Sequence, residues 1–91
     1  MANSWDEAKR RRTLAERGLD FSDAELVLTG KRQYTRRDNR REYGEPRFIT
    51  VGFLRDRFVV VVWTPRNEGR HIISMRYGHA REKARFEKYL D

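Results

Sequence analysis

The chain has no cysteine and only two histidines among its 91 residues. Disulfide bonds and thiolate metal sites are therefore excluded, and because the carboxylates are scattered we expect neither a metal centre nor a cofactor. Apolar runs near the length of about 18 residues needed to cross a membrane are also absent. The start, MANSWDEAKRRR, lacks the apolar segment typical of a signal peptide. We therefore expect a cytoplasmic protein.

Negative charge is scarce relative to positive charge. The sequence has 21 Lys and Arg against 14 Asp and Glu, which gives a net charge of +7, and arginine greatly outnumbers lysine. Arginine forms bidentate contacts with phosphate and stacks on bases, so a polyanion is the leading class of partner, with acidic proteins as the alternative. The length predicts a single domain over residues 1–91, with room for only a small core.

The segment from Arg47 to Arg76 predicts three successive antiparallel strands, because apolar runs flank short polar turns. A two-residue turn at Arg55-Asp56 places Arg47 opposite Thr64 and Glu45 opposite Arg66. A three-residue turn over 67–69 then places Ser74 beside Val62 and Arg76 beside Val60.

This register divides the sheet into an apolar face and an arginine-bearing face. We expect the apolar face to form the core with Phe48, Val59, Val61, Trp63, Ile73 and Met75. The second face is predicted to be the working face, and it carries Arg47, Ile49, Val60, Val62, Thr64, Arg66, Arg70, Ile72, Ser74 and Arg76.

Helices are expected on both sides of these strands in the sequence. The first begins after an Asp6 N-cap and ends at Gly18, and a short edge strand over 1–5 precedes it. The second begins with a capping box from Ser22 to Glu25, with Phe21 and Leu26 as its staple, and ends near Thr29. The third covers 79–90. These elements predict an α+β domain with two N-terminal helices, an antiparallel sheet of three to four strands and a C-terminal helix.

The segment from Lys31 to Pro46 mixes basic residues with Tyr34 and Tyr43 and has no apolar periodicity. It predicts a short strand over 33–35 followed by an exposed, mobile loop. Arginines interleaved with tyrosines suit RNA, where guanidinium binds phosphate and tyrosine stacks on a base. Equally, the tyrosines of a soluble loop can dock on the domain itself.

Several short motifs, in order along nearly the whole chain, resemble the BrnT toxins of bacterial type II toxin-antitoxin pairs. They are Trp5-Asp6-x-x-Lys9, Arg17-Gly18-Leu19-Asp20-Phe21, Glu45-x-Arg47 with Ile49 and Gly52, Val61-Val62-x-Thr64-x-Arg66, and Arg70-x-Ile72-Ile73-Ser74-x-Arg76 followed by Arg81-Glu82-Lys83. The chain departs from the family pattern at Thr13, Glu16, Arg17 and Met75. The resemblance implies a RelE-like fold and a ribonuclease that arrests translation. It also implies neutralisation by a BrnA-like antitoxin, through which the complex binds operator DNA and represses its own promoter.

Metal-free RNA cleavage needs proton transfer and positive charge at the transition state. The predicted catalytic residues are Arg66 and Arg76, which match arginines of the family motifs, with Glu45, His79 and Tyr77 as proton-transfer candidates. The predicted RNA-binding residues are Arg47, Arg70, Arg36, Arg37, Arg40 and Arg81. His71 is predicted to share the Trp63 face and to be structural. The alternative is a non-catalytic module that binds RNA or an acidic protein.

Overall fold

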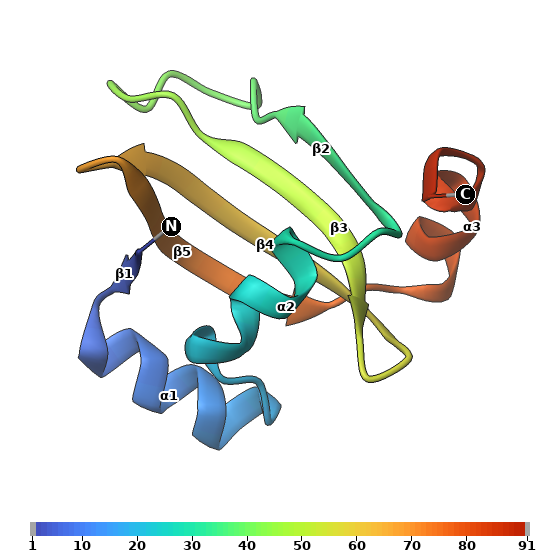
Figure 1. Cartoon of the computed structure of the whole chain (residues 1–91), viewed down its shortest axis with the longest axis horizontal. Helices are drawn as coiled ribbons and strands as arrows, with labels where there is room; N and C mark the ends of the chain where they lie inside the picture. The colour runs from blue at the N-terminus through green and yellow to red at the C-terminus, as the bar shows by residue number, and fades with distance from the viewer. Residues whose placement is uncertain (1, 91) are drawn as a thin grey trace.

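The computed structural model describes residues 2–90, which form a five-stranded mixed sheet with helices on both faces (Figure 1). The elements follow the order β1 (Asn3–Trp5), α1 (Glu7–Arg17), the 3-10 helix η1 (Phe21–Asp23), α2 (Ala24–Leu28), β2 (Gln33–Arg37), β3 (Phe48–Leu54), β4 (Arg57–Arg66), β5 (Gly69–Tyr77) and α3 (Ala80–Leu90). The strand order is β1-β5-β4-β3-β2. The α+β class and the order of the helices are confirmed.

The sheet is larger than the predicted three to four strands and is not purely antiparallel, because β1 pairs with β5 in parallel. The expected edge strand therefore exists, although Met1 lies outside the described residues. Gly69 makes this pairing possible, since a Cβ at that position would collide with the carbonyl of Ala2.

The register of the β3–β4 hairpin is confirmed. Phe48 lies opposite Trp63 and Leu54 opposite Arg57, as a two-residue turn requires. Both turn residues have positive φ, 47° at Arg55 and 67° at Asp56, which matches the right-handed twist of the flanking strands.

The register of the β4–β5 hairpin is confirmed only away from the turn. Ser74 pairs with Val62 and Arg76 with Val60, but nearer the turn Trp63 pairs with Ile72 and Arg66 with Gly69. The turn has two residues, Asn67 and Glu68, and Ile73 forms a β-bulge that restores the predicted register. The predicted three-residue turn is wrong: the turn is one residue shorter, and Ile73 is the additional residue within the strand.

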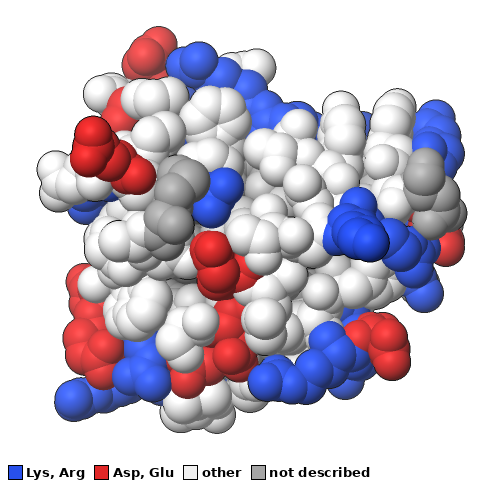
Figure 2. Space-filling model, viewed as in Figure 1, with Lys and Arg blue, Asp and Glu red and all other residues white. Residues whose placement is uncertain are grey.

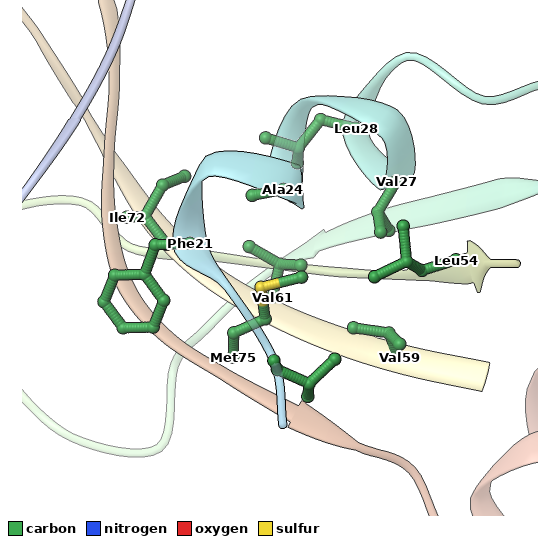
Figure 3. Packing of buried hydrophobic residues seen from close by; sticks show 10 residues of the cluster. Phe21, Ala24, Val27, Leu28, Leu54, Val59, Val61, Ile72 and Met75 are labelled. Atoms are coloured by element: carbon green, nitrogen blue, oxygen red, sulfur yellow. The ribbon is translucent and has the colours of Figure 1, made fainter. Parts of the chain in front are cut away.

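The bulge reverses the predicted faces of β5 before Ser74. Ile72 joins the core beneath α2, and Ile73 packs against the opposite cluster beneath α3. In Figure 3, side chains of η1 and α2 lie over the sheet, with Phe21 beside Ile72 of β5 and Val27 beside Leu54 of β3. On the other face Phe86 and Leu90 of α3 cover Ile49, Val60 and Val62. Val59 to Val62 are buried, so β4 is covered on both faces.

The caps of α1 agree with the prediction, but the capping box at Ser22 does not form. Asp6 accepts hydrogen bonds from the amides of Ala8 and Lys9, and Gly18 ends α1 with a φ of 71°. Asp20 caps η1 in place of Ser22 by accepting from the Ser22 amide. The predicted staple is also wrong, because the Leu26 side chain is exposed.

None of the residues of α1, 7–17, is buried, so polar contacts hold this helix in place. The Lys9 ammonium donates to the carbonyl of Ile73, and the Arg17 guanidinium donates to that of Met75. Both carbonyls lie on β5 beyond its pairing with β1. Within residues 2–90, no helix is both long enough and apolar enough to span a membrane.

Candidate functional site

Four residues at the end of the sheet where the turn joins β4 to β5 form what we call the Arg66 cluster: Glu45, Arg47, Arg66 and His71. The carboxylate of Glu45 lies 3.4 Å from a guanidinium nitrogen of Arg66 and 3.5 Å from Arg47 Nε. The Arg47 guanidinium also stacks over the ring of Tyr43, 4.0 Å from its centroid. The predicted proximity of Glu45 and Arg66 is confirmed.

His71 joins this cluster, contrary to its predicted place on the Trp63 face. It pairs with Thr64 across the sheet, because the bulge at Ile73 has reversed this part of β5. Arg66, two residues beyond Thr64, is thus its diagonal neighbour on the same face. The Nδ1 atom of His71 lies 2.9 Å from the hydroxyl of Ser4 on β1.

The surroundings of His71 favour its neutral form. Burial, followed by the positive charge of Arg66, lowers the pKa of His71 below its ordinary value of 6.5, and the negative charge of Glu45 only partly opposes this. The imidazole therefore carries little charge at pH 7 and can accept a proton.

Another set of charged residues, the Arg76 cluster, lies farther along the same face and comprises Arg36, Arg40, Ser74, Arg76 and Glu82. These residues border a hollow of about 180 Å³ whose apolar wall includes Val60, Val62 and Phe86. Arg76 donates to both carboxylate oxygens of Glu82 at 2.8 Å. This ion pair lowers the pKa of Glu82 to about 2, so Glu82 is ionised at neutral pH and is a weak base.

The Arg66 and Arg76 clusters lie apart along the strands. Arg76 pairs with Val60, which precedes Arg66 by six residues on β4, and six residues of a strand span about 20 Å. The predicted register put both arginines on one face, with Arg66 at the end of its strand and Arg76 beside Val60, and the pairing confirms this. A ligand that contacts both must be an extended one.

Three of the predicted site residues lie on the opposite face of the sheet. Arg70 stacks near Trp63 and lies 3.7 Å from Glu25 of α2. Arg37 pairs with Phe48, whose ring stacks on Trp63. Tyr77 packs against the core beneath α2, with Arg57 over its ring. The structure therefore does not bring Arg70, Arg37 or Tyr77 together with Arg66 or Arg76.

The remaining candidates, His79 and Arg81, lie at the start of α3. The backbone amide of His79 donates to Glu82, and the carbonyl of His79 accepts the first hydrogen bond of the helix from Lys83. His79 therefore occupies the cap position of α3, near the Arg76 cluster, and its side chain is exposed. Arg81 is exposed on the outside of the first turn.

The segment between β2 and β3 is mostly exposed, as predicted, but Asp38 at its start is buried. The carboxylate of Asp38 is fully enclosed and accepts from Arg40 at 2.8 and 2.7 Å and from the Tyr43 hydroxyl at 3.1 Å. Tyr34 stacks on Tyr89 of α3 with ring centroids 4.7 Å apart. Both tyrosines therefore contact the domain itself, which supports docking over a free stacking surface.

The face on which α1 and α2 lie carries charges of both signs. Figure 2 shows acidic side chains among basic ones around a mostly uncharged centre, on the side of the molecule where α1 and α2 lie. A wider hollow of about 480 Å³ lies elsewhere and is bordered by Lys31, Arg32, Phe53 and Lys83 together with Asp56 and Glu87. We place the candidate site at the clusters, because there the arginines converge with an imidazole and with carboxylates.

Within residues 2–90, no group of three or more His, Cys, Asp or Glu side chains has the arrangement of a metal site.

Comparison with known families gives one match. Residues 5–82 match the family described as "Ribonuclease toxin, BrnT, of type II toxin-antitoxin system". Among curated proteins, none matches the chain significantly. The matched range contains strands β2 to β5 and both arginine clusters.

Proposed function

Since the chain belongs to the BrnT family of ribonuclease toxins, we propose that it cleaves RNA without a metal ion, using the face that carries the Arg66 and Arg76 clusters. The observation that carries this proposal is the position of these clusters, about 20 Å apart along one pair of strands. An RNA strand that follows β4 and β5 would meet guanidinium groups at both ends of its path. Arginine neutralises phosphate charge and supplies the electrostatic stabilisation that phosphoryl transfer requires.

The residues of this face fit cleavage by the neighbouring 2′-hydroxyl of RNA. That reaction needs a proton acceptor and positive charge at the phosphorus, and it leaves a 2′,3′-cyclic phosphate and a 5′-hydroxyl. We assign Arg66 and Arg76 to phosphate binding, with Arg47, Arg36 and Arg40 extending the basic surface. Glu45 and Glu82 hold these arginines in place through the ion pairs described above.

The test is cleavage of a reporter transcript, both bare and on ribosomes, followed by analysis of the RNA ends. We expect ends with cyclic phosphate and 5′-hydroxyl, and on bare RNA we expect cleavage to persist in EDTA. Arg66→Ala and Arg76→Ala should each lower the cleavage rate at least tenfold. If no transcript is cleaved while RNA still binds, the protein is a binding module and the proposal is wrong.

A type II toxin has a cognate protein antitoxin, and we propose that this one binds DNA, so that the toxin-antitoxin complex represses its own promoter. The strong positive charge of the toxin favours an acidic segment of the antitoxin at the interface. Co-purification with the product of the adjacent gene, followed by a gel-shift assay on the upstream DNA, tests this. We expect a shift only when the antitoxin is present; a shift by the toxin alone would contradict the proposal.

A further inference from the structure

His71 is placed among groups that suit proton transfer at a phosphate. Its ring stands on β5 opposite Thr64, with Arg66 as diagonal neighbour and Glu45 beside that arginine. From the N-terminal side, Lys9 and Asp6 also act on it electrostatically. Arginine at this point can bind a phosphate while the imidazole faces the adjacent ribose.

The contact with Ser4 engages the Nδ1 atom of His71 and is compatible with a free Nε2. Nδ1 lies 2.9 Å from Ser4 Oγ, and a hydroxyl can accept a hydrogen bond as readily as it donates one. When Nδ1 carries the proton and donates a hydrogen bond to Ser4 Oγ, Nε2 holds the free electron pair and can accept a proton.

Building on the ribonuclease function proposed above, we infer that His71 is the general base of the reaction and that Ser4 positions it, so that the scissile phosphate lies at the Arg66 cluster. Nε2 takes the proton of the 2′-hydroxyl as its oxygen forms a bond to phosphorus. The bond from phosphorus to the 5′-oxygen breaks, and that oxygen takes a proton from water. The resulting hydroxide is neutralised when the imidazolium gives up its proton.

The other acceptors on this face are less suited to that role. Glu45 faces two arginines, Arg47 and Arg66, and Glu82 is bound by both terminal nitrogens of Arg76. The ion pair with Arg76 lowers the pKa of Glu82 and makes it a poor base at neutral pH, and the carboxylate of Glu45 is occupied by its two arginines. The competing imidazole is His79, beside the Arg76 cluster.

The first test compares His71→Gln with the wild type and with Glu16→Gln, an exposed substitution on α1 that serves as the control. We expect His71→Gln to lower kcat/KM by 100-fold or more, while binding of a fully 2′-O-methylated RNA octamer, which cannot react, changes less than twofold. The acidic limb of the wild-type profile of kcat/KM against pH should disappear in this variant. Unchanged kcat/KM, or an acidic limb that persists, overturns the inference.

A further measurement keeps the inference testable if His71→Gln does not fold. The sequence has two histidines, so NMR titration of the wild type can follow both imidazoles, with His79→Gln used to assign the signals. We expect the methylated octamer to raise the pKa of His71 more than that of His79, because the phosphate anion stabilises the nearer imidazolium. A larger effect on His79 would move the scissile phosphate to the Arg76 cluster and overturn the inference.

Ser4→Ala tests the positioning role separately. We expect a threefold to tenfold fall in kcat with an unchanged KM, and Ser4→Thr, which keeps the hydroxyl, should restore most of the rate. If Ser4→Ala is as active as the wild type, the positioning role is wrong. If the wild type itself cleaves no RNA, the proposed function fails and His71 has no such role; if the wild type cleaves and His71→Gln cleaves equally, only this inference fails.

Discussion

At the scale of single residues, the enclosed carboxylate of Asp38 organises a segment that has no regular secondary structure. Its bonds to Arg40 and Tyr43 close the loop on itself, and the Arg40 guanidinium holds the pKa of Asp38 well below its usual range. We expect Asp38→Asn to destabilise the protein by about 1 to 2 kcal/mol, since charge-assisted bonds are lost but the Arg40 side chain is partly exposed. Urea denaturation measures this.

Asp56→Asn is a matched control for that experiment. Asp56 is exposed in the β3–β4 turn with a φ of 67°, a conformation that asparagine adopts readily. Its free energy of unfolding should stay within about 0.5 kcal/mol of the wild type. Equal stability of Asp38→Asn and Asp56→Asn would show that the Asp38 bonds contribute nothing.

Some contacts of single residues could be predicted from the sequence, and others could not. Asp6 and Gly18 were correctly predicted as caps, because capping depends on neighbours within a few residues. Asp20 took the role predicted for Ser22, since both side chains can reach the same turn and the sequence does not say which will. The burial of Asp38 was not foreseeable, because charged loop residues are usually solvated.

At the scale of elements, the turn between β4 and β5 carries a residue poorly suited to its conformation. Asn67 and Glu68 have φ of 51° and 64°, and a two-residue turn of this kind prefers glycine in second place. We expect Glu68→Gly to raise the free energy of unfolding by about 0.5 to 1 kcal/mol. Glu68→Val should lower it, because a β-branched residue is strained at positive φ; thermal unfolding of both variants provides the comparison.

Helix α1 is expected to open before the rest of the molecule, because it buries no side chain and depends on Lys9 and Arg17 for its attachment. Hydrogen exchange should be faster at the amides of α1 than at those of β4. Replacing both residues, Lys9→Gln with Arg17→Gln, should speed exchange in α1 while leaving β4 unchanged. If exchange in α1 is as slow as in β4, other contacts anchor the helix.

At the scale of the whole molecule, buried or partly buried ion pairs make stability depend on acid pH. Glu82 beside Arg76 has a pKa of about 2, and Arg40 lowers the pKa of Asp38 further. Both pKa values are depressed by folding, so the stabilisation is complete above pH 5 and is lost as the pH falls toward 2. We expect a loss of about 1 kcal/mol for each of these carboxylates, because solvent screens the partly exposed arginines.

Urea denaturation at pH 7 and pH 3 measures this dependence. The double variant Asp38→Asn with Glu82→Gln should be less stable at pH 7 and should lose less on acidification. If the double variant loses as much stability between pH 7 and pH 3 as the wild type, other groups cause the pH dependence. Asp20 beside Arg10 is then the first candidate.

The overall architecture was predictable because it depends on long apolar segments and short turns. The apolar runs on either side of Arg55-Asp56 predicted a two-residue hairpin, and the structure confirms its register. The site was less predictable. A bulge has no simple sequence signal, so the faces of Arg70 and His71 were assigned wrongly, whereas the pairing of Arg76 with Val60, beyond the bulge, was predicted correctly.

The bulge at Ile73 gives β5 a property that a regular strand lacks. Residues of odd and even number normally alternate between the faces of a sheet, yet His71 and Arg76 differ in parity and share a face. The strand therefore has two registers, offset by one residue. The part before the bulge pairs with Trp63–Arg66, and the part after it pairs with Val59–Val62. A one-residue insertion at the Asn67–Glu68 turn could be absorbed at the bulge, so that Arg76 would keep its place opposite Val60.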